Sequence, residues 1–298
     1  MVMQVLVVAL SLSASAAQAA QTAVAAPPSH DRAFWRAIVT ADFAVPSGAT
    51  APVLAAELDR MLGDADPELR DAFAGTILPE WIRTGTLDAD ALRPRIRTWI
   101  ANLSADVQQV GTDRTLRRSF SALMLAAVVN RDNAEPLLTP DEFAAIRDAA
   151  IGYLNAEQDV RGFDDRLGWI HSAAHTADVL RALNRSRRLA PTDPPKILDA
   201  VGRKLRTAPA VFTFGEDERF ARAIAMLLIR DDFNLDAFRT WVADLAAPAA
   251  GPPTVAGLRA GQNVKNMLAK LGVLLARQPT LPPAAATARD LVLAAVRF

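Results

Sequence analysis

Cysteine is absent from the 298-residue sequence, and its absence excludes several kinds of site at once. Without cysteine there is no disulfide, no thiolate metal ligand and no cysteine nucleophile. An excess of charge of one sign is also lacking, because 33 Lys and Arg residues balance 33 Asp and Glu residues. Proteins that bind nucleic acid carry a basic surface that neutralises phosphates. The charge balance therefore predicts that nucleic acid is not a partner.

Aromatic residues are also scarce, at 6% of the chain with a single tyrosine, whereas hydrophobic residues reach 51%. Most of the hydrophobic residues are Ala, Leu and Val. Ala and Leu are strong helix formers, while strands favour aromatic and β-branched side chains. No segment alternates convincingly between apolar and polar residues with a period of two. We predict an all-α protein without a sheet.

The amino terminus carries an apolar run over residues 2–12, followed by small residues that end in Ala-Gln-Ala at 17–19. This pattern is typical of a secretory signal peptide and its cleavage site, although no Lys or Arg precedes the run. A buried amino-terminal helix is the alternative. We predict a signal peptide over 1–19, a flexible leader over 20–30, and a periplasmic or secreted mature protein. No later segment has the ~20 apolar residues that span a bilayer, so no transmembrane segment is expected after cleavage.

Apolar residues recur at helical spacing through almost all of the remaining chain. The predicted helices are 33–40, 51–62, 67–83, 88–103, 113–129, 139–155, 167–185, 193–206, 216–230, 234–246, 256–277 and 284–297. Thr139 and Glu142 form a capping-box pattern at the start of one of them. Short connections make successive helices antiparallel neighbours. The sequence predicts one domain over 31–298, an α-α superhelix of antiparallel helix pairs similar to HEAT or armadillo arrays, with a compact helical bundle as the alternative.

Two of the three histidines, His171 and His175, are four residues apart. On a helix they share one face with Asp178, so this face is either solvated or lines a groove. The apolar residues of the segment form a stripe on nearly the opposite face: Trp169, Ala173, Ala177 and Leu180. The spacing allows both imidazoles to reach one divalent metal such as zinc, with Asp178 as an oxygen ligand. The general base of zinc proteases is missing, because Ser172 follows the first histidine.

The loop upstream places four carboxylates around one arginine: Glu157, Asp159, Arg161, Asp164 and Asp165. In a functional interpretation, Glu157 or Asp159 completes a metal shell and Arg161 binds a carboxylate or phosphate. In a structural interpretation, Arg161 ties the acids together and Asp164 or Asp165 caps the next helix. For Asp159 and Arg161 the two interpretations have equal weight, whereas the two later acids fit capping better.

Gly162 permits a positive φ that turns the chain back toward the histidines. A second polar cluster opens the helix predicted at 216–230: Glu216, Asp217, Glu218 and Arg219. Acidic residues in a first turn stabilise the positive end of the helix dipole. Alternatively, Glu216 or Asp217 joins the histidines at a polar site, with Arg219 beside them.

Two groups of arginines are expected at the surface. Arg114, Arg117 and Arg118 fit a solvated helical face, and the arginines over 181–188 fit cations at the carboxyl end of a helix. Phosphate loops, nucleophile elbows and dinucleotide fingerprints are all absent from the sequence. A Ser-His-Asp triad built on a nearby serine stays open, although nothing in the sequence positions one.

These polar residues also carry a resemblance. The chain resembles a bacterial domain-of-unknown-function family, the one numbered 2785, over most of residues 110–270 and in the family's order. The matching pieces are Arg118-Ser119-Phe120-Ser121, Tyr153-Leu154, Glu157, Asp159, Arg161-Gly162, Gly168-Trp169, His171, His175, Asp178, Phe214-Gly215-Glu216-Asp217-Glu218-Arg219 and Asn263-Val264-Lys265-Asn266. The resemblance implies an all-helical array without an assigned activity. The chain departs from the commoner form at Ile170 and Ser172, where small Ala residues are usual, and in its export signal, since many relatives look cytoplasmic.

Three hypotheses follow. The leading one is a binding or scaffold module whose concave polar face holds a small anionic ligand or a peptide. The second is a metal-dependent hydrolase, with His171, His175 and an acidic residue on the metal and Asp159 or Glu216 as general base. The third is a purely structural polar network, closed to solvent and fully hydrogen-bonded. The candidate ligand-binding residues are Asp159, Arg161, Trp169, His171, His175, Asp178, Glu216, Asp217 and Arg219.

Overall fold

The computed structural model describes residues 30–247 and 251–296. The predicted signal peptide and all but the last residue of the predicted leader lie outside the described residues. Within the described ranges, no helix combines the length and the apolar character needed to cross a membrane.

The described part of the chain contains twelve α-helices, one π-helical segment and a two-stranded hairpin. In chain order these are α1 (Arg32–Thr40), α2 (Ala51–Met61), η1 (Glu68–Ala74), α3 (Gly75–Thr84), α4 (Ala89–Ser104), α5 (Arg114–Ala134), α6 (Pro140–Ala156), β1 (Phe163–Asp164), β2 (Gly168–Trp169), α7 (Ser172–Arg185), α8 (Pro194–Thr207), α9 (Glu216–Leu228), α10 (Leu235–Ala246), α11 (Val255–Ala276) and α12 (Pro283–Ala295). The predicted all-α class is confirmed.

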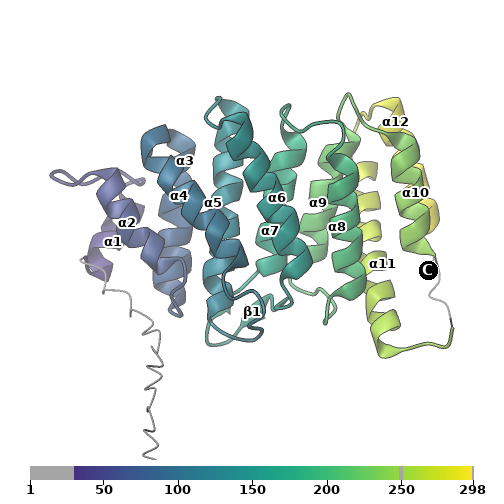
Figure 1. The fold of residues 1–298 in the computed structure, drawn as a ribbon, viewed down its shortest axis with the longest axis horizontal. Coiled ribbons are helices and arrows are strands. Elements are labelled where there is room, and N and C mark those ends of the chain that lie inside the picture. Colours follow the sequence, from purple (N-terminus) through teal and green to yellow (C-terminus); the bar gives the residue numbers. More distant parts are fainter. Residues whose placement is uncertain (1–29, 248–250, 297–298) are drawn as a thin grey trace, which may run out of the picture.

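The helices form two rows that run along the long axis of the molecule (Figure 1). One row contains α3, α5, α7, α9 and α11, each packed against the next. The other row contains α4, α6, α8, α10 and α12 in the same manner. Successive helices alternate between the rows, so the apolar stripes of both rows meet in one continuous core. The superhelical twist that the sequence suggests stays a prediction.

The start of α6 shows how local sequence sets the helix ends. Thr139 accepts a hydrogen bond from the Glu142 backbone N–H at 3.2 Å, and its own N–H donates to the Glu142 carboxylate at 2.8 Å. This reciprocal pair satisfies two N–H groups that the first helical turn leaves unpaired. The predicted capping box is therefore confirmed.

The segment predicted as one helix over 67–83 begins as the π-helical η1 and continues as α3. Gly75 lies at the junction, where a Cβ atom would be only 3.0 Å from the Arg70 carbonyl oxygen and 3.2 Å from the Phe120 ring. The wider π-helical turn is common at functional sites. Here it presents the side chain of Arg70 toward α5 and the hairpin.

The expectation of no sheet was wrong at one place, since β1 and β2 pair as a short antiparallel hairpin. The carboxylate of Asp164 accepts hydrogen bonds from the backbone N–H groups of Arg166 at 3.0 Å and Leu167 at 2.9 Å. Gly168 supplies the positive φ, at 70°. Aspartate and glycine favour such turns for these two reasons. Asp164 therefore caps the hairpin turn and not the next helix, which begins only at Ser172.

Candidate functional site

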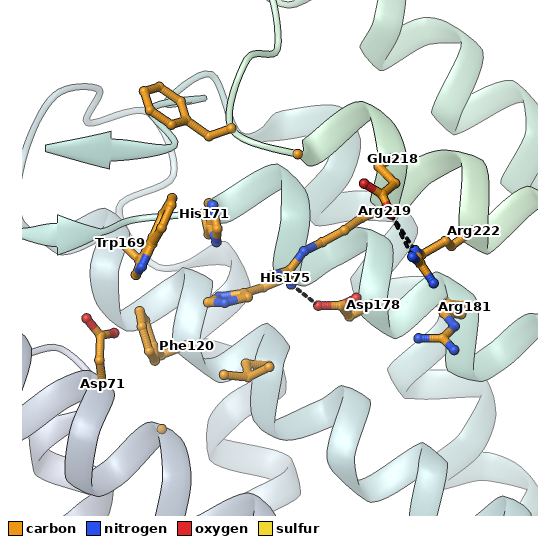
Figure 2. A pocket seen from close by; sticks show the side chains of 14 residues that line it. Asp71, Phe120, Trp169, His171, His175, Asp178, Arg181, Glu218, Arg219 and Arg222 are labelled. Atoms are coloured by element: carbon orange, nitrogen blue, oxygen red, sulfur yellow. Dashed lines mark hydrogen bonds and ion pairs between the residues drawn. The ribbon is translucent and has the colours of Figure 1, made fainter. Parts of the chain in front are cut away.

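A cavity of about 670 Å³ opens between η1, α5, the hairpin, α7 and the start of α9 (Figure 2). We call it the histidine cavity, because His171 and His175 both line it. Its aromatic walls are Phe120, Trp169 and Phe214. Its opposite end carries three arginines and their acidic partners: Asp178, Arg181, Glu218, Arg219 and Arg222. Asp71 lies at the rim near Trp169.

His171 precedes α7 instead of lying within it, so the helical geometry assumed for the three polar residues does not apply at this position. Its φ is +51°, in the left-handed region, and its side chain makes no capping hydrogen bond. The backbone N–H groups of Ile170 and His171 both donate to the Gly162 carbonyl, at 2.9 and 3.3 Å. A non-glycine residue in this region costs about 1–3 kcal/mol and persists only where its surroundings hold it.

Trp169 does not lie opposite the histidines, as the helical pattern predicted. Its ring lies against His171 with centroids 4.3 Å apart and planes tilted by 33°, and the residue remains 42% exposed. The Phe163 ring also contacts it, nearly perpendicular, with centroids 4.9 Å apart. The predicted stripe is wrong for Trp169, because that residue belongs to β2 and not to the helix. The structure brings Trp169 and the histidines into one wall.

The ring of His175 is positioned by hydrogen bonds with Ser119 of α5. Its Nδ1 lies 2.9 Å from the Ser119 hydroxyl oxygen and 3.2 Å from the Ser119 carbonyl oxygen. The hydroxyl itself donates to the Ile170 carbonyl. Both Ser119 and Ser172 are buried, and Ser172 donates to the Asp159 carbonyl, so neither serine is placed as a nucleophile facing the cavity.

Both imidazoles are neutral at pH 7. Burial is the main cause that lowers the pKa of His171, to about 4, and the positive charge of Arg219 adds to it. Burial also lowers the pKa of His175 well below its ordinary value, followed by the neighbouring His171 and Arg219. Their rings meet edge to face with centroids 5.7 Å apart. A neutral imidazole is a donor at one nitrogen and an acceptor at the other, so each ring can make hydrogen bonds of both kinds and carries no positive charge.

The arginine end of the cavity is only partly neutralised. Arg219 donates to Asp178, and Arg222 donates to Glu218 at 2.6 Å. Burial raises the pKa of Asp178, against the lowering effect of Arg219. The Nε atom of Arg181 is buried and has no hydrogen-bond partner. The guanidinium of Arg181, which lines the cavity, therefore has an N–H group that donates to no atom of the described residues.

The predicted metal set does not assemble. Asp178 pairs with Arg219. Within residues 30–247 and 251–296, no three His, Asp or Glu side chains converge on one point as metal ligands. A catalytic zinc site needs three protein ligands. The hydrolase hypothesis therefore lacks its third ligand.

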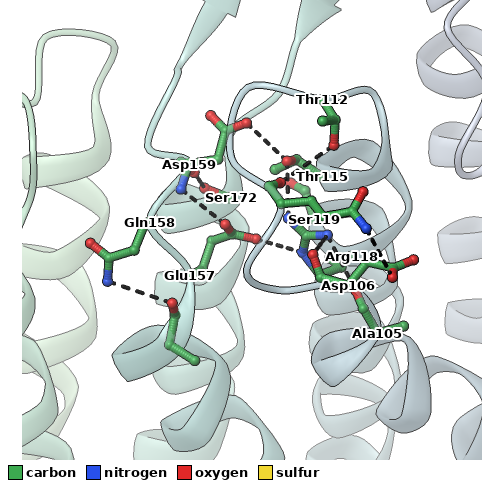
Figure 3. Close-up of polar contacts among 12 residues, drawn as sticks. Ala105, Asp106, Thr112, Thr115, Arg118, Ser119, Glu157, Gln158, Asp159 and Ser172 are labelled. Atoms are coloured by element: carbon green, nitrogen blue, oxygen red, sulfur yellow. Dashed lines mark hydrogen bonds and ion pairs between the residues drawn. The ribbon is translucent and has the colours of Figure 1, made fainter.

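Asp159 and Arg161 do not line the histidine cavity. They pair with each other in the loop before the hairpin, where Asp159 belongs to a network of polar contacts (Figure 3). The Asp159 carboxylate accepts hydrogen bonds from Thr115 at 2.9 Å, from the Gly111 N–H at 3.0 Å and from Arg161 at 2.6 Å. Burial acts to raise the pKa of Asp159, but the bonds from Arg161 and Thr115 hold it below its ordinary value. Asp159 is thus fully engaged within the protein.

The same network contains a buried ion pair between Arg118 and Glu157, with 2.6 Å between Nε and the carboxylate (Figure 3). Glu157 also accepts from the Asp159 N–H at 2.9 Å, and the Lys204 ammonium donates to its carbonyl at 2.5 Å. The solvated face predicted for Arg118 is wrong, because this side chain is buried. We call Thr115, Arg118, Glu157, Asp159 and Arg161 the loop network.

A second cavity, of about 350 Å³, lies on the other side of the loop, and Asp159, Arg161 and Glu216 line it. Phe214 lines both cavities. Gly162 does not adopt the predicted positive φ. Glycine is needed there for close approach, because a Cβ would lie 2.4 Å from the Phe214 ring and 2.5 Å from the Glu216 carboxylate.

The acidic residues at the start of α9 lie in different environments. Glu216 is buried and accepts a hydrogen bond from the Phe214 N–H at 2.9 Å, and burial raises its pKa. Asp217 forms an ion pair with Lys270 of α11 at 2.6 Å and does not line the histidine cavity. Of this cluster, only Glu218 and Arg219 reach the cavity.

Residues 103–273 match the model of a family described as "Protein of unknown function (DUF2785)". The match covers more than half of the chain. The chain belongs to this family. The match includes α5, α7, α9 and the hairpin, and so most of the histidine cavity and the whole loop network. No curated protein and no solved structure matches the chain.

Part of the cavity lies outside the DUF2785 match, in a region that sequence reasoning did not single out. Arg70 of η1 is buried and donates to the carbonyls of Leu167 and Trp169, and to Asp71 at 2.9 Å. Its guanidinium lies 5.1 Å from the Phe120 ring centre, a cation–π distance. Arg70 therefore fixes the base of the hairpin and one aromatic wall. Its partners are 97 and 99 residues away in sequence, so no local pattern signals this role.

Proposed function

We propose that the protein is a binding module for a small organic anion, which it holds in the histidine cavity. The combination of an aromatic wall at Trp169 with an incompletely bonded guanidinium at Arg181 carries this proposal. The volume, about 670 Å³, is in the range of small-molecule sites. An acidic ligand supplies a counter-charge to Arg181 at the N–H groups that face the cavity, and bonds from guanidinium to anions are among the strongest in proteins.

The other arginines support an anionic ligand without having to lose their partners. Arg219 and Arg222 each use one carboxylate neighbour, and a guanidinium has five N–H donors. Both line the cavity beside Arg181. An acidic group at this end is thus surrounded by donors from three side chains on two helices.

We also propose that the mature protein is a single domain over residues 31–298 that acts in the periplasm or outside the cell after loss of residues 1–19. The apolar run and the Ala-Gln-Ala sequence support this location. The test is amino-terminal sequencing of the protein recovered from its native host. A mature chain that begins at Ala20 agrees with export, and a chain that retains its first residues contradicts it.

Thermal-shift measurements test the binding function. Benzoate, succinate and glucuronate are each compared with the corresponding primary amide, which has nearly the same shape without the charge. A carboxylate at 100 times its Kd stabilises the folded state by about 2.7 kcal/mol, so Tm rises for an acid and not for its amide. Arg181→Gln is expected to abolish the shift.

Arg239→Gln is the matched control, because Arg239 on α10 forms an exposed pair with Asp236 and does not line the cavity. It should retain the full shift. Equal shifts for acids and amides, or a shift that survives in Arg181→Gln, would contradict the proposed function.

A further inference from the structure

The hydrogen-bond pattern around Ser119 fixes which nitrogen of His175 carries the proton. The Ser119 hydroxyl has one hydrogen, and it donates that hydrogen to the Ile170 carbonyl. The two Ser119 oxygens near Nδ1, at 2.9 and 3.2 Å, can then only accept. Nδ1 of His175 is therefore the N–H donor, and Nε2 carries the lone pair.

Nε2 of His175 has no hydrogen-bond partner among the described residues, since His175 makes its hydrogen bonds through Nδ1 alone. The residue is 6% exposed and lines the cavity. A shielded acceptor without a donor is unfavourable by about 1–3 kcal/mol. A ligand that brings an O–H or N–H group to this nitrogen relieves that cost.

The cavity thus has binding partners for two different groups of one ligand, a hydrogen-bond donor and an acidic group. His175 supplies an acceptor, and the end with Arg181, Arg219 and Arg222 supplies charged donors. Trp169, which is 42% exposed, lies on the far side of the histidines from these arginines (Figure 2). Indole rings pack well against the C–H faces of sugar rings, because these faces are apolar while the hydroxyls point outward to hydrogen-bond acceptors.

We infer that the ligand of the histidine cavity is a polyhydroxylated ring that bears an acidic group, a sugar acid or a sugar phosphate, with a hydroxyl donating to His175 and its acid bound by the arginines. This inference rests on the proposed function and narrows it from organic anions in general. A carboxylate and a phosphate share the chemistry that the arginine end recognises, so the experiment includes both.

Isothermal titration calorimetry with four compounds tests the inference. Glucuronate and glucose 6-phosphate have both features, glucose lacks the acid, and cyclohexanecarboxylate lacks the hydroxyls. At least one of the two sugar acids should bind roughly tenfold or more tightly than both glucose and cyclohexanecarboxylate, since one satisfied acceptor is equivalent to about that factor. Which of the two binds better identifies the acidic group.

The outcomes separate the two proposals. If cyclohexanecarboxylate binds as tightly as glucuronate and glucose 6-phosphate, the inference is overturned and anion binding stands. If glucose binds as tightly as both acids, or if none of the four compounds binds, the inference is overturned together with the proposed function.

Variants of His175 test whether the preference for hydroxylated acids depends on the acceptor nitrogen Nε2. His175→Gln keeps an acceptor oxygen near the position of Nε2, and His175→Leu removes it. The preference for the hydroxylated acid over cyclohexanecarboxylate should persist in the Gln variant and fall about tenfold in the Leu variant.

Should His175→Leu fail to fold, His175→Phe carries the test, because phenylalanine keeps an aromatic ring beside Phe120, whose ring centre lies 4.9 Å from that of His175. It supplies no acceptor and should reduce the preference in the same way. An unchanged preference in every folded variant that lacks an acceptor overturns the inference.

Discussion

Two arginine–carboxylate pairs in this molecule have the same chemistry and different surroundings. In the pair Arg118–Glu157 the side chains are 1% and 4% exposed, and in the pair Arg219–Asp178 they are 34% and 25% exposed. All three guanidinium nitrogens of Arg118 donate to other groups of the protein. Arg219 donates only to Asp178 and lines an open cavity.

The difference in exposure and in hydrogen bonding distinguishes the roles of the two pairs. A buried pair with every bond made inside the protein holds the loop network in one arrangement and leaves nothing for a ligand. The half-exposed pair retains unused donors in the same cavity as Nε2 of His175, which has no hydrogen-bond partner among the described residues. The structural hypothesis therefore describes the loop network well, while the histidine cavity carries the features of a binding site.

The strongest test of this contrast is Arg118→Met. It leaves the Glu157 carboxylate buried without its charged partner, and the loss of one member of a buried pair costs about 3–5 kcal/mol. Urea denaturation should show this loss in the free energy of unfolding. The double variant Arg118→Met/Glu157→Gln should recover part of it, because the unpaired carboxylate is removed while the amide oxygen can still accept from the Asp159 N–H. A loss below about 1 kcal/mol in the single variant would contradict a structural role.

Gly162→Ala tests the close packing between the loop and Phe214. The added Cβ would lie 2.4 Å from the Phe214 ring, and such overpacking costs about 1–3 kcal/mol. Gly261→Ala is the control, since nothing lies within 4 Å of a Cβ at that helical position. Alanine there should stabilise the protein by up to about 1 kcal/mol. Similar thermal stability of the two variants would contradict the packing argument.

Acid stability tests the neutral state of His171. The imidazole of the unfolded chain titrates near pH 6.5, whereas in the folded protein the pKa is about 4. Between these values the unfolded state binds more protons, so the free energy of unfolding decreases as the pH falls, by at most about 1.4 kcal/mol per unit. Above pH 6.5 this contribution is constant. The stability difference between wild type and His171→Asn, followed from pH 7.5 to 4.5, should shrink accordingly, and a constant difference would show that folding does not lower the pKa of His171.

The smallest effect on stability is expected for Arg219→Gln. Partly exposed ion pairs contribute about 0–1 kcal/mol, so urea denaturation should barely distinguish this variant from wild type. Binding of the organic acids should nevertheless weaken, as measured by calorimetry. A loss of stability comparable to that of Arg118→Met would remove the contrast between the two pairs.

Much of the fold follows from the sequence, because helix periodicity and capping are local properties. The capping box at Thr139 is set by neighbours three residues apart, and it was predictable for that reason. The hairpin was not, since two residues in each strand are too few to show a period of two. The helical pattern was therefore extended back over Trp169 and His171, which places Trp169 on the wrong face.

The candidate site was predictable in its residue types and not in its grouping. His171, His175, Asp178 and Arg219 do line one cavity. Asp159 belongs to the loop network, because its partner Thr115 lies 44 residues earlier in the chain. Arg181 looked like an ordinary cation near a helix end, since the sequence does not show that its Nε lacks a partner in the folded protein.

Phe214 forms a wall common to the histidine cavity and the second cavity. Gly162 sets the position of this wall, because any larger residue there would meet the Phe214 side chain. Gly162 lines only the second cavity, yet a substitution at this one position changes the boundary of both.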